Sequence, residues 1–177
     1  LSEISNRKEM ALNCSEYLNF QILDFLDYEN LRMHSNDTLD LVKLINKHIN
    51  IYKPDTILCN HSGDLNSDHR IAFEATYTAL RPFTINKKYI EFITYEVVSS
   101  TNWSNKHIGK IFSPNYYLDI SKYIKTKKIA LEFYKKEMRK YPHTRSWKSI
   151  LNFHHIRGAE VGLEYAEAYE IIKKITK

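Results

Sequence analysis

Apolar residues recur at helical spacing in the first third of the chain. From Ser5 to Phe20 they fall on one stripe, and a second stripe runs through residues 36–54, which open with an Asn or Asp cap and stop at Pro54. Both segments are predicted to be helices. The short apolar run between them, residues 20–27, predicts a strand.

The middle of the chain alternates between strand and helix patterns. Residues 55–60 form a short apolar run, residues 67–82 return to helical spacing and end at Pro82, and residues 89–98 form a further apolar run. Such an alternation is typical of a mostly parallel sheet that helices cover on both faces. We therefore expect an α/β fold.

The C-terminal third is predicted to be helical. Helical patterns lie near residues 122–140 and 146–157, separated by a turn, and a last amphipathic stretch covers residues 159–174. With no internal repeat and no low-complexity linker, residues 1–177 are expected to form a single domain.

Composition narrows the class of protein. The chain has 177 residues and is 43% hydrophobic, which suffices for one core, and it has no apolar segment of roughly 18 residues that could cross a bilayer. The start of the chain lacks the apolar middle of a signal peptide. Its two cysteines, Cys14 and Cys59, form no disulfide framework and are expected to be buried thiols. A soluble protein of the reducing cytoplasm is predicted.

The net charge of +5 comes mostly from residues 122–148 and from the C-terminal lysines. A basic face interleaved with tyrosines could attract nucleic acid or an anionic sugar phosphate, but it is also typical of a solvated helix face. Because the sequence carries no recognised nucleic-acid-binding motif, we expect no nucleic-acid partner.

The segment from His61 to His69 contains two histidines and two aspartates and joins the apolar run at 55–60 to the following helix. In an open parallel sheet, ligands bind at this carboxyl end of a strand. Asn66 or Ser67 can cap the helix, so His69 would lie in its first turn, where the helix dipole favours a neutral, metal-binding imidazole.

Asp64 or Asp68 could orient that imidazole by binding its other nitrogen. The same residues also fit an ordinary turn with a surface histidine, since aspartate and asparagine form caps and turns for backbone reasons alone. Spacing by itself therefore does not establish a metal site.

Longer strings resemble the PIG-L/LmbE family of zinc-dependent deacetylases, in a branch whose second signature runs D-L-N-x-D-H-R. The resemblance covers nearly the whole chain. It rests on five blocks in the family's order: DLNSDHRIAFEATYTALRP (64–82), YEVVSSTNW (95–103), FSPNYYLDIS (112–121), YPHTRS (141–146) and RGAEVGLEYAEAY (157–169).

This resemblance implies a Rossmann-like, LmbE-like α/β fold and removal of an N-acetyl group from a glucosamine-type sugar or glycoconjugate. In the family, zinc is held by an H-P-D-D motif together with the histidine of the D-H pair, which corresponds to His69. Three protein ligands leave an open position for the water that attacks the amide. Asp68, the neighbour of His69, is a candidate catalytic residue.

The more widely known second signature, H-P-D-H, has a leading histidine where this chain has Asn66. His143 is the candidate to take over its acid or oxyanion role. Tyr95, Glu96 and Ser99 follow a strand and could line the substrate pocket. The candidate substrate-binding residues are Asn66, Arg70, Arg145 and Arg157.

The H-P-D-D string does not occur in this sequence. We expect an N-terminally truncated or cleaved deacetylase with an incomplete zinc site, so that this chain alone retains little zinc and has no turnover. Stoichiometric zinc would instead point to a site built from His61, Asp64 and His69. The alternative function is that of a non-catalytic homologue that binds carbohydrate or nucleotide-sugar. The sequence does not determine whether the protein forms an oligomer.

Overall fold

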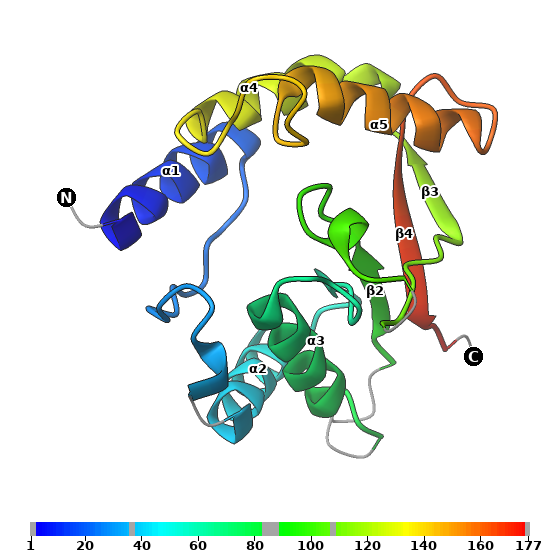
Figure 1. The fold of residues 1–177 in the computed structure, drawn as a ribbon. Helices are drawn as coiled ribbons and strands as arrows, with labels where there is room; N and C mark the ends of the chain where they lie inside the picture. Colours follow the sequence, from blue (N-terminus) through cyan, green and yellow to red (C-terminus); the bar gives the residue numbers. More distant parts are fainter. Residues whose placement is uncertain (1–2, 36–37, 83–88, 107–108, 176–177) are drawn as a thin grey trace. The chain divides into compact units, whose positions relative to one another are not determined.

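The computed structural model describes residues 3–35, 38–82, 89–106 and 109–175 (Figure 1). It divides the chain into two compact units, each made of two segments. We call Leu1–Tyr28 with Leu118–Glu167 the helical unit, and Glu29–Tyr117 with Ala168–Lys177 the sheet unit. A single domain over residues 1–177 stays a prediction.

The helical unit contains α1 (Glu3–Leu18), α4 (Ile124–Phe133) and α5 (Trp147–Ala159), close to where the sequence predicts helices. Helix α1 packs on α4, and the rings of Tyr17 and Phe133 lie 5.7 Å apart at their centroids. The apolar positions of α1 and α4 that predicted these two helices are thus on elements that pack together.

The strand predicted for residues 20–27 is wrong: this segment is irregular and connects α1 to the next part of the chain. Its apolar side chains remain in contact with solvent, with Phe20 50% and Leu23 44% exposed. A short apolar run cannot be assigned from periodicity alone, because a strand also needs a partner strand for its backbone hydrogen bonds.

The sheet unit contains the predicted alternation of helices and strands. Helix α2 (Thr38–Tyr52) precedes β1 (Thr56–Asn60), and α3 (Ser67–Ala79) leads towards β2 (Glu91–Tyr95). Strands β1 and β2 pair in parallel, with Asn60 opposite Tyr95 at their ends. The sheet has the order β1-β2-β4-β3, in which β3 is Tyr116–Asp119. Short 3-10 helices cover Met33–Ser35 (η1), Thr101–Trp103 (η2) and Ser121–Tyr123 (η3).

The last stretch of the predicted helical third is not a helix. Residues Ala166–Lys173 form β4, which pairs antiparallel with β2. Ala166 and Ala168 are buried, while the residues between and after them are only partly so, which is the period-two pattern of a strand. The α/β class is therefore confirmed, with a parallel β1–β2 pair, an antiparallel β4, and helices α4 and α5 before it.

The core of the sheet unit lies between α2, α3 and the first two strands. Phe92 is completely buried and lies against the rings of Phe73 and Tyr77. Cys59 belongs to the same cluster, and Cys14 is buried in the helical unit, so both cysteines are free buried thiols as predicted. This packing holds the ends of β1 and β2 in place.

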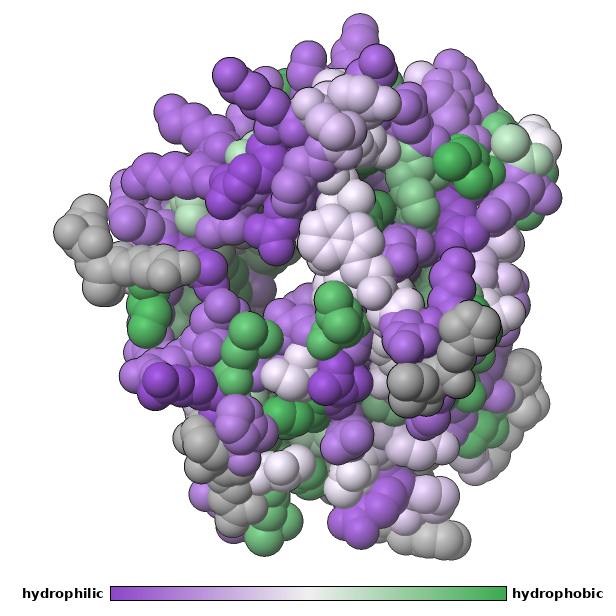
Figure 2. Space-filling model, viewed as in Figure 1, coloured by the Kyte–Doolittle hydropathy of each residue, from purple (hydrophilic) through white to green (hydrophobic). Residues whose placement is uncertain are grey.

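The surface over α4 and α5 is largely hydrophilic in the view of Figure 2. In this part of the chain, Lys122, Lys125 and Lys128 are exposed. Among the described residues, no helix combines the length and apolar character that crossing a membrane requires.

His154 should make the stability of the protein depend on pH. It is buried in α5, and its Nδ1 lies 3.1 Å from the Ala166 carbonyl oxygen. Burial is the main cause that lowers the pKa of His154 from 6.5 to about 4; Lys127 lowers it further, and Glu167 partly opposes this. Because the unfolded chain then binds the proton more readily, stability is fully present above pH 6.5 and falls as the pH drops towards 4.

Urea unfolding at several pH values measures this effect. We expect the wild type to lose on the order of 2 to 3 kcal/mol between pH 7 and pH 4 through this residue. His154→Gln should flatten that part of the profile, whereas His155→Gln, at the exposed neighbour, should leave it unchanged. An unaltered profile in His154→Gln would contradict the assignment.

Candidate functional site

Two loops meet at the carboxyl edge of the parallel strands. Residues 61–66 connect β1 to α3, and residues 96–104 follow β2. Since Asn60 and Tyr95 are paired at the strand ends, both loops leave the same edge of the sheet. The helix cap is Asn66 rather than Ser67, because the Asn66 side chain accepts a hydrogen bond of 2.8 Å from the Asp68 N–H.

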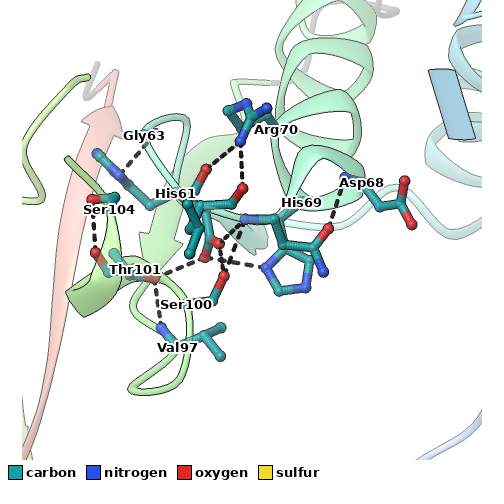
Figure 3. Close-up of polar contacts among 12 residues, drawn as sticks. His61, Gly63, Asp68, His69, Arg70, Val97, Ser100, Thr101 and Ser104 are labelled. Atoms are coloured by element: carbon teal, nitrogen blue, oxygen red, sulfur yellow. Dashed lines mark hydrogen bonds and ion pairs between the residues drawn. The ribbon is translucent and has the colours of Figure 1, made fainter. Parts of the chain in front are cut away.

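Asp64 is the centre of this site. Its side chain is fully buried, yet it accepts hydrogen bonds from the Ser100 hydroxyl, from the Thr101 hydroxyl at 2.8 Å, and from the Asn66 N–H at 2.9 Å. Figure 3 shows Ser100 and Thr101 reaching this cluster from the loop after β2. A buried carboxylate is stable only when its oxygens are satisfied in this way.

The imidazole of His69 completes the contacts of Asp64. Its Nδ1 lies 3.1 Å from Asp64 Oδ2, and the side chain is 26% exposed. Burial is the largest influence on the pKa of Asp64 and raises it, but the hydrogen bonds from His69, Ser100, Asn66 and Thr101 together hold that pKa below its ordinary value. Asp64 is thus a carboxylate that orients the ring, one of the two possibilities that the sequence left open.

Asp68, the other residue that could have oriented His69, makes different contacts. Its carboxylate accepts hydrogen bonds from the backbone N–H groups of Leu31, at 2.6 Å, and Met33, at 3.1 Å. In Figure 3 its side chain points away from the cluster around Ser100 and Thr101. These contacts tie the start of α3 to the segment that precedes α2.

Arg70 supports the loop itself. Its guanidinium donates hydrogen bonds to the carbonyl oxygens of Asp64, at 2.7 Å, and Leu65, at 2.8 Å. The side chain therefore crosses back over the turn that carries Asp64, so the structure places this predicted substrate-binding residue beside His69 and on the loop backbone.

His61 lies in the same loop but is enclosed. Its Nδ1 accepts a hydrogen bond of 3.0 Å from the Gly63 N–H, its Nε2 lies 3.3 Å from Glu170, and the edge of its ring meets Phe112. Burial chiefly lowers the pKa of His61, although the carboxylates of Glu170 and Asp64 oppose this. Both ring nitrogens face protein groups, so His61 fixes the turn.

The remaining predicted residues belong to the helical unit. His143 Nδ1 accepts a hydrogen bond of 3.0 Å from the Arg145 N–H, and the Arg145 guanidinium lies 3.0 Å from Glu137. Arg157 contacts Glu160 at 2.8 Å. Their roles in catalysis and substrate binding stay predictions.

Sequence reasoning missed Ser100 and Thr101. It singled out their neighbours Tyr95, Glu96 and Ser99 because they follow a strand. The available signal was the position of two hydroxyl residues just after the strand that pairs with β1, opposite a loop rich in aspartate. Which hydroxyl would reach Asp64 depends on the turn that the loop makes, and sequence spacing does not give that.

One residue of this loop region, His69, is arranged as a zinc ligand would be. An imidazole whose second nitrogen faces a carboxylate is a common zinc ligand, and His69 with Asp64 has that arrangement. Within residues 3–35, 38–82, 89–106 and 109–175, however, no three His, Cys, Asp or Glu residues are grouped to hold a metal ion. The described residues therefore fit one part of a zinc site and not the whole.

Gly63 should be essential for the shape of the loop. A Cβ added there would lie 1.8 Å from the carbonyl oxygen of Lys110 and 3.0 Å from Cε1 of His61. We expect Gly63→Ala to destabilise the protein by about 1–3 kcal/mol in urea unfolding, because backbone would have to move. Gly109→Ala is the control, since its Cβ would approach nothing closer than 3.4 Å. Equal stability of the two variants would refute the close contact.

Comparison with known proteins gives a family match for part of the chain and a shared fold for nearly all of it. Residues 1–80 match the sequence profile of the family described as PIG-L: GlcNAc-PI de-N-acetylase. The fold is similar to that of N,N'-diacetylchitobiose deacetylase from Pyrococcus horikoshii, with a TM-score of 0.71 at 16% identity over 95% of this chain and 63% of that one. The chain thus spans less than two thirds of the length of that enzyme.

Two further solved structures share the fold. The conserved protein TT1542 from Thermus thermophilus has a TM-score of 0.70 at 15% identity over 100% of this chain and 77% of that one. GalB, the 4-carboxy-2-hydroxymuconate hydratase from Pseudomonas putida, has 0.69 at 17% identity over 98% and 74%. The four blocks beyond residue 82, the branch and the missing H-P-D-D segment stay predictions. The resemblance to the PIG-L (LmbE-like) family is confirmed over residues 1–80, and the fold is LmbE-like.

Proposed function

We propose that this protein is a metal-dependent hydrolase that removes an N-acetyl group from a glucosamine-type sugar or glycoconjugate. Two findings support a sugar deacetylase: the match of residues 1–80 to a de-N-acetylase family, and a fold shared with a diacetylchitobiose deacetylase. The substrate would be a small amino-sugar or its conjugate, bound at the carboxyl edge of the parallel strands.

One observation carries the proposal. His69, in the first turn of α3, is partly exposed and has its Nδ1 against the buried carboxylate of Asp64. This arrangement directs the Nε2 side of the ring away from Asp64 and keeps the ring in a fixed orientation. A surface histidine in an ordinary turn would not need a buried carboxylate held by two hydroxyls.

When bound, a zinc ion would supply a nucleophilic water near neutral pH and would polarise the amide carbonyl. In this chain, we assign His69 as a ligand and Asp64 as the group that orients it. Asn66 and Arg70 would shape the edge of the substrate site, since their present contacts hold the helix start and the loop backbone. Catalytic roles for Asp68 and His143, and substrate binding by Arg145 and Arg157, stay predictions: the Asp68 carboxylate accepts hydrogen bonds from backbone N–H groups, and the other three residues belong to the helical unit.

Two other functions are compatible with the fold. A non-catalytic homologue would bind carbohydrate or nucleotide-sugar without releasing acetate. GalB, which has this fold, is a hydratase, so the fold alone does not choose the reaction. The de-N-acetylase description of the matching family favours the hydrolase.

Release of acetate tests the proposal. The protein, in the form encoded by its gene, is incubated with zinc and either N-acetylglucosamine or N,N'-diacetylchitobiose, and free amine and acetate are measured. We expect turnover that His69→Ala lowers by more than about 100-fold, because losing a ligand costs more than losing an outer partner. His155→Ala, which removes an exposed histidine from α5, should retain wild-type activity.

The alternatives give different results in the same assay. Binding of the sugar, seen by calorimetry, with no acetate released would favour the non-catalytic homologue. Turnover that is equal in wild type and His69→Ala would exclude His69 as a ligand and with it the proposed site.

A further inference from the structure

We propose that Ser100 and Thr101 are positioning residues that act through Asp64 to hold the His69 imidazole as its Nδ1–H tautomer, with the Nε2 lone pair directed away from Asp64. The geometric part of this inference depends only on the contacts within the sheet unit. Its consequence for metal binding rests on the proposed function.

The hydroxyl of Thr101 can donate in one direction only. Its Oγ1 accepts a hydrogen bond of 2.8 Å from the Val97 N–H, which is a donor without acceptor capacity. The single hydroxyl proton is then free for Asp64 Oδ2, at 2.8 Å. The loop backbone thereby fixes the direction in which Thr101 donates.

The hydroxyl of Ser100 is fixed in the same way, but it donates to the other oxygen of Asp64, Oδ1. Its Oγ accepts from the Asn66 N–H at 3.2 Å and donates to Asp64 Oδ1. The Asn66 N–H also reaches that oxygen at 2.9 Å. Each oxygen of Asp64 therefore receives a hydroxyl proton whose direction is set by a backbone donor, and neither oxygen has a proton to offer in return.

Asp64 can consequently meet His69 only as an acceptor. Its side chain is completely buried, and its two oxygens already receive the hydroxyl protons of Ser100 and Thr101 and the Asn66 N–H. The 3.1 Å contact of His69 Nδ1 with Oδ2 then favours a proton on Nδ1, because a ring lone pair there would face the lone pairs of an acceptor. In a neutral imidazole, this leaves the lone pair on Nε2, the form that a metal binds.

The two hydroxyls come from a different loop than the histidine. Asp64 and His69 follow β1, whereas Ser100 and Thr101 follow β2, the parallel neighbour of β1. The hydroxyl of Ser104 lies in that second loop and donates at 2.8 Å to the Thr101 carbonyl oxygen without reaching Asp64. Ser104 is thus a matched control for loss of a hydroxyl that stabilises the same loop.

Nitrogen NMR of the histidine rings tests the inference on the 177-residue chain without added metal. We expect the wild type to show His69 as the Nδ1–H tautomer. Thr101→Val, which removes the hydroxyl and keeps the shape, should populate the Nε2–H tautomer as well. Thr101→Ser should restore the wild-type spectrum, and Ser104→Ala should leave it unchanged.

A second measurement uses zinc alone and the protein in the form encoded by its gene. Thr101→Val should weaken zinc binding by about 10–100-fold, the range typical for loss of a group that orients a metal ligand. Thr101→Ser and Ser104→Ala should bind zinc as the wild type does. Circular dichroism confirms that each variant is folded, and Ser100→Ala, with the same expected shift of tautomer, takes the place of Thr101→Val if the latter does not fold.

The outcomes separate this inference from the proposed function. A wild-type His69 that carries its proton on Nε2, or an unchanged tautomer in both Thr101→Val and Ser100→Ala, would overturn the positioning role even if the protein releases acetate. A tautomer shift in a protein that releases no acetate would support the positioning role and leave the deacetylase proposal refuted.

Discussion

The site depends on keeping one carboxylate ionised inside the protein. Removing Asp64 from water is costly, and the protein offsets that cost with two hydroxyls and a backbone N–H directed at its oxygens, and with the imidazole of His69 beside them. Both hydroxyls are in turn fixed by backbone N–H groups. The contact with this carboxylate also sets the orientation of the His69 ring.

The parallel pairing of β1 and β2 is what allows such a network to form. Neighbouring parallel strands end at the same edge, so a loop with the acceptor and a loop with the donors meet although they lie far apart in the sequence. The side chains of Phe73 and Phe92 pack beneath them and fix the distance between strand and helix. The geometry at this edge is therefore a property of the pair of strands.

Periodicity predicted most of the secondary structure, and the cluster of histidines and aspartates from His61 to His69 drew attention to the loop after β1. The stripes in residues 36–54 and 67–82 identified α2 and α3 because each buries one face. Residues 20–27 and 159–174 were misassigned because short apolar or amphipathic runs fit more than one structure until their partners are known. The role of Asp64 was left open beside Asp68, and Thr101 was missed, since both depend on which way a turn directs a side chain.

The contact of His61 with Glu170 joins the site to β4. The network around Asp64 needs only β1, β2 and the loops that follow them, whereas the contact of His61 also needs β4, which lies far from β1 in the sequence. Contacts between segments distant in sequence carry a larger loop-closure cost and form more slowly. The two histidines of one loop thus depend on different parts of the sheet: His69 on the parallel pair, and His61 also on β4.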